Sequence, residues 1–209
     1  MVKVGVIALQ GGVAEHLHML RRASEETGIP VETVLVKRPW HLDGVSAVII
    51  PGGESTTIGK LMKRTGVAER LRKLLVEEGV AAMGTCAGAV LFAKRVRDRI
   101  RGETGQETLA AMDIAVTRNY YGRQRESFEA LVKLEDPTGL APELEEKPFH
   151  GVFIRAPSID EAWGGARITS RLQGVGVAAV QGAMIALAFH PELTSDTRLH
   201  RLLLRLAKK

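Results

Sequence analysis

Cysteine, asparagine and aromatic residues are scarce in this sequence of 209 residues. It contains one cysteine (Cys86) and one asparagine (Asn119), and aromatic residues make up 4% of it. One cysteine cannot form an internal disulfide, so the sequence predicts a cytoplasmic protein rather than a secreted, disulfide-stabilised one. The N-terminal residues run directly into a strand-like pattern, without a separate leader segment. No apolar run approaches the roughly 20 residues of a membrane span, so we expect no contact with a membrane.

Charged residues are abundant, but their arrangement is not typical of a nucleic-acid-binding protein. The chain carries 29 lysines and arginines against 24 acidic residues, for a net charge of +5. The basic residues are spread through the expected helices and are not interleaved with aromatic side chains. We therefore predict no nucleic-acid partner and interpret the basic residues as a solvated surface, with a surface for a partner protein as the alternative.

Motifs for metals and nucleotide phosphates are also missing. With one cysteine and no His-x-x-x-His pair, the sequence offers none of the common zinc ligand spacings. The glycine-rich loop at residues 51–57 is not followed by the Gly-Lys-Ser/Thr of a phosphate-binding loop. The sequence thus predicts neither a metal nor a cofactor.

The first 94 residues alternate apolar runs with amphipathic stretches, which is typical of a doubly wound α/β sheet. Runs rich in β-branched residues predict buried parallel strands, and helical spacing of apolar residues predicts the helices between them. Glycine and proline end most of these elements. The expected strands are Val2–Leu9, Val31–Val36, Ser46–Ile50 and Val80–Met83, and the expected helices are Val13–Thr27, Thr56–Arg64, Val67–Glu78 and a stretch that ends at Lys94.

The pattern changes after Lys94. Arg95–Thr108 is charged and contains glycine, so we interpret it as a surface excursion. Shorter strands and a hairpin at Gln181-Gly182 should then add antiparallel or mixed pairing, and an apolar stripe predicts a closing helix over Asp196–Lys209. The whole pattern predicts a single-domain α/β fold, residues 1–209, as a three-layer sandwich with a mostly parallel central sheet. The shorter strands are Leu109–Thr117, Ser127–Leu134, Gly151–Ile154, Gly174–Val180 and Ala183–Phe189.

The only cysteine stands between an expected strand and an expected helix. Gly84-Thr85-Cys86-Ala87-Gly88 has the form of a nucleophile elbow, with sulfur in place of the usual hydroxyl oxygen. Glycine is needed at both ends because side chains two residues either side of the nucleophile would collide in so tight a turn. The helix start favours the thiolate form. A small buried cysteine of an α/β core is the alternative, so the nucleophile interpretation needs partners elsewhere.

His190 and Glu192 are the best partners. A thiolate nucleophile needs a base, and the base needs an orienting group. Of the six histidines, His190 follows an expected strand, which places it at the carboxyl edge of the sheet, where α/β folds bind their ligands. Glu192 can point back to the imidazole across Pro191, which keeps the chain extended. Taken alone, His190-Pro191-Glu192 could also be a turn that ends a strand.

An oxyanion-binding loop is the third expected component of the site, after the nucleophile and its base. The candidate is Pro51-Gly52-Gly53-Glu54-Ser55-Thr56-Thr57. Attack of a thiolate on an acyl group creates an oxyanion that backbone N–H groups must hold. The elbow offers the N–H of Ala87, and a second is expected from a glycine-rich loop after the neighbouring strand. The same loop could contain a helix N-cap at Ser55 or Thr56, and both interpretations can hold together.

These motifs resemble those of the class I, triad-type glutamine amidotransferases. Further stretches narrow the resemblance to the glutaminase subunits of pyridoxal 5′-phosphate synthase and run from one end of the chain to the other. They are Leu9-Gln10-Gly11-Gly12 with Glu15-His16, Pro51–Thr57, Arg118-Asn119 with Gly122-Arg123-Gln124 and Ser127-Phe128-Glu129, Phe153-Ile154-Arg155-Ala156-Pro157, and His190–Thr194 with Asp196.

The resemblance implies hydrolysis of L-glutamine to L-glutamate and ammonia. Ammonia would pass through a tunnel to a separate synthase subunit, in a hetero-oligomeric complex that builds the vitamin B6 cofactor. By motif match, Cys86 would form a γ-glutamyl thioester, His190 would carry protons and Glu192 would orient His190. The remaining site residues are implied as Gly53 and Ala87 for the oxyanion, and Gly53, Glu54, Ser55, Arg118, Ile154 and Arg155 for the amino-acid end of glutamine.

Two stretches depart from the family pattern. Tyr120-Tyr121 stands where the family has a small residue followed by phenylalanine, and Arg95–Thr108 is longer and more charged than expected. Neither contains a member of the triad.

Two other functions are compatible with parts of this pattern. The same triad could serve another nitrogen-incorporating enzyme or a stand-alone hydrolase, although Gly122-Arg123-Gln124 and Ile154–Pro157 argue against this. An inactive scaffolding domain is the second, and the intact set of Cys86, His190 and Glu192 argues against it.

Overall fold

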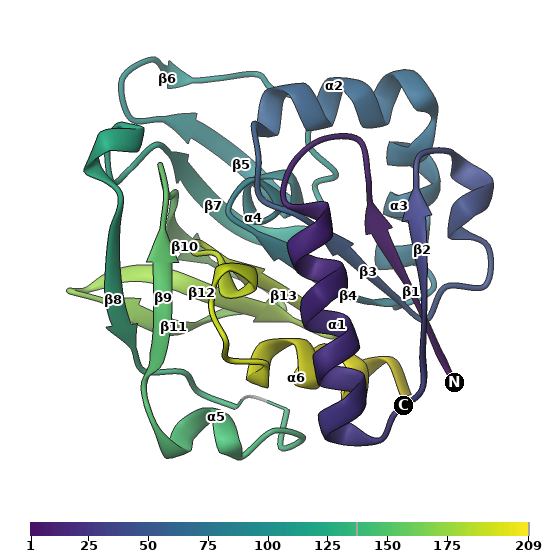
Figure 1. Cartoon of the computed structure of the whole chain (residues 1–209). Coiled ribbons are helices and arrows are strands. Elements are labelled where there is room, and N and C mark those ends of the chain that lie inside the picture. Colours follow the sequence, from purple (N-terminus) through teal and green to yellow (C-terminus); the bar gives the residue numbers. More distant parts are fainter. Residues whose placement is uncertain (137, 209) are drawn as a thin grey trace.

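Two β-sheets flanked by helices make up the molecule (Figure 1). The computed structural model describes residues 1–136 and 138–208, and within these ranges one sheet has 11 strands and the other has two. The strands are β1 (Val2–Ile7), β2 (Val31–Val36), β3 (Ala47–Ile50), β4 (Ala81–Thr85), β5 (Ala93–Asp98), β6 (Gly102–Glu103), β7 (Met112–Arg118), β8 (Phe128–Val132), β9 (Phe149–Phe153), β10 (Ser158–Ala162), β11 (Ala166–Leu172), β12 (Val175–Gln181) and β13 (Met184–Leu187). The helices are α1 (Val13–Thr27), α2 (Ser55–Thr65), α3 (Val67–Val76), α4 (Ala87–Phe92), α5 (Glu143–Glu146) and α6 (Arg198–Lys208), with short 3-10 helices η1 (Pro39–Leu42), η2 (Gln124–Glu126) and η3 (Pro191–Leu193).

Five neighbouring strands, in the order β2-β1-β3-β4-β13, run parallel. Apolar side chains alternate between the two faces of the sheet, as strand geometry requires. In β3, Val48 and Ile50 enter one core and Ala47 and Ile49 the other. Because parallel strands end at the same edge, the loops after β1, β3, β4 and β13 meet there.

Helices cover both faces of these parallel strands. Helices α1 and α6 pack side by side on one face, where Leu20 and Leu203 are fully buried in the same core (Figure 1). Helices α2, α3 and α4 cover the other face through the buried side chains of Met62, Leu71 and Phe92. This is the predicted three-layer α/β arrangement with a mostly parallel central sheet.

Beyond β13 the sheet becomes mixed, as predicted. Strands β12 and β13 form the expected antiparallel hairpin, and Gly182 in its turn has a φ of 56°. Strand β10 pairs antiparallel with β12 and β7, and β5 pairs parallel with β7. We did not predict β10 and β11, because their apolar residues are separated by charged and hydroxyl side chains that are equally typical of loops.

The interpretation of Arg95–Thr108 as a surface excursion is partly wrong. Its first four residues belong to β5, which starts at Ala93 immediately after α4 and pairs with β7. Val96 packs against the core while the arginines on either side of it are exposed. Those arginines conceal the strand alternation in the sequence.

A second, two-stranded sheet supports one wall of the site described below. Strands β8 and β9 pair antiparallel. The rings of Phe128 and Phe153 stack at 4.8 Å, and Phe153 also lies 5.6 Å from the ring of Phe189 at the end of β13. These contacts fix the segment that follows β9 next to the segment that follows β13.

The C-terminal helix is shorter than predicted. Asp196 precedes it, and its carboxylate accepts a hydrogen bond from the backbone N–H of Arg198, at 3.1 Å, as suits a helix start. The expected end at Lys209 lies outside the described residues. Among the helices of the described ranges, none has the length and apolar character needed to cross a membrane.

We expect Leu203→Ala to lower the free energy of unfolding by about 2–5 kcal/mol, because truncation leaves a cavity between α6 and the sheet. Urea unfolding followed by circular dichroism measures the change. The control is Val76→Ala at the end of α3, where the side chain is 48% exposed, and it should change the free energy by no more than about 0.5 kcal/mol. Equal losses in the two variants would contradict the assigned burial.

Candidate active site

Cys86 occupies a strained turn between β4 and α4. Its φ of 48° and ψ of −99° are rarely adopted by a non-glycine residue and cost about 1–3 kcal/mol. The predicted crowding is confirmed: a Cβ on Gly84 would lie 2.6 Å from the carbonyl carbon of Gly88. A Cβ on Gly88 would lie 2.2 Å from the carbonyl oxygen of Ile50. The backbone N–H of Cys86 donates to Leu187, at 2.8 Å, which ties the turn to β13.

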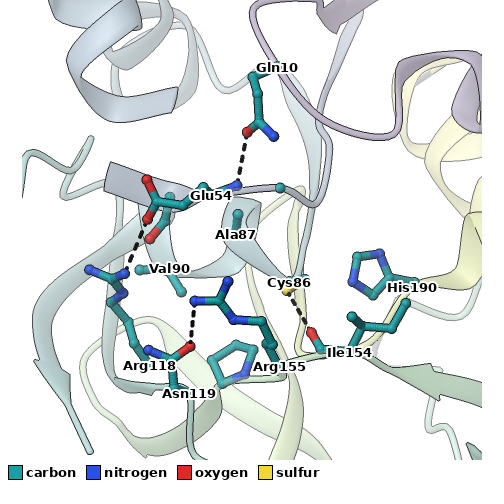
Figure 2. A pocket seen from close by; sticks show the side chains of 13 residues that line it. Gln10, Glu54, Cys86, Ala87, Val90, Arg118, Asn119, Ile154, Arg155 and His190 are labelled. Carbon is teal, nitrogen blue, oxygen red and sulfur yellow. Dashed lines mark hydrogen bonds and ion pairs between the residues drawn. The ribbon is translucent and has the colours of Figure 1, made fainter. Parts of the chain in front are cut away.

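His190 and Glu192 lie beside this turn. The Nδ1 atom of His190 is 2.8 Å from Oε1 of Glu192, and both side chains are buried. Burial lowers the pKa of His190, but hydrogen bonds and charge interactions with Cys86 and Glu192 outweigh it and raise the pKa to about 10. An imidazolium is therefore favoured next to the sulfur, which is the arrangement that stabilises a thiolate. In Figure 2 the imidazole and the carbonyl oxygen of Ile154, 3.7 Å from the sulfur, both lie beside Cys86.

A pocket of about 270 Å³ opens over the sulfur atom. This volume is close to the lower end of known small-molecule sites, roughly 300–1,000 Å³. Glu192 lies behind His190 and does not line the pocket. All the other predicted site residues do, namely Gly53, Glu54, Ser55, Cys86, Ala87, Arg118, Ile154, Arg155 and His190.

Arg118 and Glu54 form a charged end of the pocket (Figure 2). The Nη2 atom of Arg118 is 3.2 Å from Oε1 of Glu54. Its Nη1 atom donates to Gln106 Oε1, at 2.6 Å, and to Thr56 Oγ1, at 3.0 Å. These contacts fix the guanidinium plane at the end of the pocket away from His190.

Glu54 also caps α2. Its carboxylate accepts hydrogen bonds from the backbone N–H groups of Thr56, at 3.1 Å, and Thr57, at 2.7 Å. Partial burial raises the pKa of Glu54, but these hydrogen bonds and the one from the Thr57 hydroxyl outweigh it and lower the pKa. The alternative interpretation of the loop as an N-cap at Ser55 or Thr56 is therefore wrong by one or two residues, because a glutamate side chain is long enough to reach back to these N–H groups.

A second arginine is held by an asparagine. Arg155, with a φ of 47°, donates from Nη2 to Asn119 Oδ1 at 3.4 Å. Asn119 in turn donates to the buried Asp98 at the end of β5, at 2.8 Å. Burial raises the pKa of Asp98, but hydrogen bonds from the backbone N–H groups of Ile100 and Arg101 and from Asn119 outweigh it and lower the pKa. A fixed carboxylate thus anchors the Asn119–Arg155 wall.

The glycine-rich loop is held by hydrogen bonds on two sides. The N–H of Gly52 donates to Thr85 Oγ1, at 2.9 Å, and its carbonyl accepts from the N–H of Gly12, at 3.2 Å. A Cβ on Gly52 would lie 2.3 Å from Cε1 of His190, so glycine is required there. Ala87 is the first residue of α4, where backbone N–H groups lack helical partners. Gly53 and Ala87 line the pocket from two directions, the loop after β3 and the start of α4.

Comparison with known proteins decides the family. Residues 6–209 match the model of the SNO glutamine amidotransferase family. The chain belongs to this family. It is 53% identical, over the whole of both chains, to a protein of Aeropyrum pernix named pyridoxal 5′-phosphate synthase subunit PdxT. The protein of the same name from Staphylothermus marinus is 50% identical over 96% of both chains.

Solved structures agree with the SNO family assignment. A crystal structure of a glutamine amidotransferase, 43% identical, matches with a TM-score of 0.81 over 99% of both chains. A glutamine amidotransferase of Thermotoga maritima, 16% identical, matches with a TM-score of 0.65 and shares the fold. The family resemblance and the fold inferred from the sequence are both confirmed.

Some residues of this SNO family site were not predicted to line the pocket. Gln10 and Asn119 line the pocket, and Gln10 accepts a hydrogen bond from the N–H of Glu54 at 2.9 Å. Their positions in the fold could have identified both residues. Gln10 lies in the loop after β1, and Asn119 directly follows β7, at the carboxyl edge of the sheet. Among residues 1–136 and 138–208, no group of three or more His, Cys, Asp or Glu side chains could hold a metal ion.

We expect Gly88→Ala to lower the free energy of unfolding by about 1–3 kcal/mol, because its Cβ would press against backbone that cannot move aside. Chemical denaturation measures the loss. Gly165→Ala is the matched control, since a Cβ there would lie no closer than 3.6 Å to any side chain. If Gly88→Ala is as stable as Gly165→Ala, the elbow is looser than described.

We expect Glu192→Gln to lower the pKa of His190 from about 10 by roughly one unit or more, because a neutral amide no longer stabilises the imidazolium. An NMR titration of the histidine side chains measures this pKa. Glu129→Gln, which removes an exposed carboxylate beside His150, should leave the titration of His190 unchanged. An unchanged pKa in Glu192→Gln would mean that the carboxylate does not control this imidazole.

Proposed function

We propose that this chain is a glutaminase subunit that hydrolyses L-glutamine to L-glutamate and ammonia, and that it supplies the ammonia to a pyridoxal 5′-phosphate synthase subunit. The observation that carries the proposal is the grouping of Cys86, His190 and Glu192 beside a pocket with charged residues at its far end. The identity with pyridoxal 5′-phosphate synthase subunits over the full chain supports the choice of pathway.

Glutamine would bind with its carboxamide over the sulfur and its amino-acid end toward the charged residues. Glu54 suits the ammonium group, and the guanidinium groups of Arg118 and Arg155 suit the α-carboxylate. Ser55 and Ile154 would line the passage between these groups and Cys86. The charged end thus selects an amino acid and positions its side-chain amide over the nucleophile.

The first half of the reaction forms a thioester. The Cys86 thiolate attacks the carboxamide carbon, a C–S bond forms, and the carbonyl electron pair moves to oxygen. The N–H groups of Gly53 and Ala87 hold this oxyanion. When the carbonyl re-forms, the C–N bond breaks, and His190 gives its proton to the nitrogen, which leaves as ammonia.

The second half releases glutamate. His190, now neutral, takes a proton from a water molecule as its oxygen attacks the thioester carbon. The C–S bond then breaks, and its electron pair returns to Cys86 as thiolate. Glu192 holds the Nδ1–H of His190 throughout, so that Nε2 exchanges the protons. Each turnover thus restores the thiolate–imidazolium pair.

The partner should act through the loop that holds Gly53. The peptide between Gly52 and Gly53 can rotate at low cost, so its N–H need not face the pocket until a partner docks. Gln10 and Gly12 both contact this loop, which supports a docking surface that includes Gln10–His18. We infer a hetero-oligomeric complex in which the isolated chain is weakly active.

We also propose that residues 1–209 form one glutaminase domain in the cytoplasm. Packing of α1, near the start of the chain, against α6, near its end, supports a single unit. The single cysteine, which cannot form an internal disulfide, supports the reducing compartment.

We expect ammonia release from glutamine to be slow for the isolated chain and to rise about tenfold or more when the synthase subunit of the same source is added. A coupled glutamate dehydrogenase assay measures ammonia. Cys86→Ala should abolish ammonia release in both conditions, because no thioester can form. The variant should still bind the synthase subunit in size-exclusion chromatography.

Different results would overturn different parts of this proposal. Full activity of the isolated chain without any gain on mixing would keep the triad and remove the partner. No ammonia in either condition would exclude the glutaminase function.

A further inference from the structure

Two histidines that the reaction above does not use lie behind the triad. His16 on α1 and His200 on α6 are both fully buried. The Nδ1 atom of His16 is 3.0 Å from Nε2 of His200, and their ring centroids are 5.3 Å apart. Neither side chain lines the pocket. Burying two ionisable rings costs free energy unless their polar atoms are hydrogen-bonded. The other contacts of this pair therefore indicate what the pair does.

The second nitrogen of His16 faces the triad. Its Nε2 atom is 3.2 Å from Oγ1 of Thr85 and 3.6 Å from Oε2 of Glu192. Oε1 of Glu192 holds His190, whereas Oε2 is buried and has no hydrogen-bond partner among the described residues. The imidazole of His16 is thus the polar group placed to complete this carboxylate.

Thr85 connects the same imidazole to the oxyanion loop. It is the residue before the nucleophile, and its hydroxyl accepts the N–H of Gly52 at 2.9 Å. One side chain therefore touches both the orienting carboxylate and the hydroxyl that holds the glycine-rich loop. The contacts join α1, the elbow, η3 and the loop after β3.

Both histidines are held neutral. Burial lowers the pKa of His16 well below its usual value, and the neighbouring rings of His200 and His190 lower it further. Burial alone lowers the pKa of His200 to about 3. A neutral imidazole carries a single N–H, so the position of that hydrogen determines what His16 can do.

The hydrogen-bond partners of the two tautomers favour placing the hydrogen of His16 on Nε2. In this tautomer His16 donates to Thr85 and presents the same N–H to Oε2 of Glu192, 3.6 Å away, while its Nδ1 accepts from His200 and Nδ1 of His200 keeps a lone pair rather than a hydrogen. The other tautomer would turn a lone pair toward the Glu192 carboxylate and leave a buried N–H of His200 unpaired. The first arrangement is favoured because an unmade donor in the interior is costly.

We propose that His16 is a positioning residue of the glutamine-hydrolysing site: its Nε2–H, held in place by His200, fixes the second oxygen of Glu192 and the hydroxyl of Thr85, and so couples the triad to the oxyanion loop. The role in turnover rests on the proposed glutaminase function. The role in holding the Cys86–His190 pair can be measured without it.

Three variants separate positioning from packing. His16→Leu removes the donor at similar size, whereas His16→Gln keeps an amide N–H near the place of Nε2. His150→Leu is the matched control, because His150 is exposed on β9, where its Nε2 atom lies 2.7 Å from the exposed carboxylate of Glu129. The titratable groups that face His190 are Cys86 from the elbow, Glu192 from η3 and His16 from α1, so the pH behaviour of this set is the direct readout.

The first measurement is the pH profile of alkylation by iodoacetamide in the isolated chain, where Cys86 is the only cysteine. We expect the rise in reactivity to move to higher pH by about one unit in His16→Leu, because a displaced Glu192 stabilises the imidazolium less. His16→Gln should return the profile to within about half a unit of the original, and His150→Leu should not change it.

The second measurement is glutamine turnover in the complex with the synthase subunit. His16→Leu should lower kcat about tenfold or more with KM changed less than about twofold, because His16 positions reacting groups but does not contact the substrate pocket. Thr85→Val removes the hydroxyl that lies between His16 and the N–H of Gly52 but keeps the approach of His16 to Glu192, so it should lower kcat and leave the alkylation profile unchanged.

The outcomes distinguish this proposal from that of the previous subsection. An unchanged alkylation profile in His16→Leu, or a His16→Gln variant as impaired as His16→Leu, would overturn the positioning role and leave packing alone. Absence of glutamine hydrolysis by the wild-type complex would remove the proposed function, yet the alkylation profiles would still decide whether His16 holds the triad. A lower melting temperature of His16→Leu, with its profile restored by His16→Gln, would still support the proposal.

Discussion

The strained backbone at Cys86 is the constraint on which the rest of the site depends. A φ of 48° at a residue with a side chain is stable only where the surroundings leave no alternative. Glycines at positions 84 and 88 let the turn close on itself and on β3. The N–H of Cys86 is then fixed by β13, the strand that also carries His190 to the same edge. The geometry of the nucleophile therefore depends on both the strand order and the placement of the two glycines.

Buried charge behind the pocket is confined, in the described part of the chain, to one pair of side chains, His190 and Glu192. Glu192 is a buried carboxylate, and the cost of its burial is offset by the imidazolium of His190. The neutral state of His16 and His200 follows from their burial, to which the neighbouring rings of His200 and His190 add in the case of His16. One buried ion pair is thus surrounded by uncharged hydrogen-bonding groups, and the opposite end of the pocket holds a separate pair, Arg118 and Glu54, that is open to a substrate.

The sequence was most informative where function requires unusual local chemistry. The elbow, the His190–Glu192 pair and the glycine-rich loop are short segments whose residue types follow from geometry, and the structure brings them together. It was least informative where long-range packing decides. The strand β5 is hidden because its exposed positions are arginines, and the glutamate cap of α2 depends on a side chain reaching back to N–H groups ahead of it. The contact between His16 and Glu192 joins residues far apart in the chain, so no spacing rule reveals it.

The position of β13 has a consequence for how the protein is made. This strand lies in the interior of the 11-stranded sheet as the last of the parallel strands, beside β4, although about 100 residues separate the two in the chain. During synthesis the nucleophile leaves the ribosome long before the strand that anchors it and before the histidine that activates it. A nascent or prematurely terminated chain therefore exposes an ordinary thiol with no imidazole beside it. Activation of the nucleophile thus requires the C-terminal segment that begins with β13 and contains His190 and Glu192.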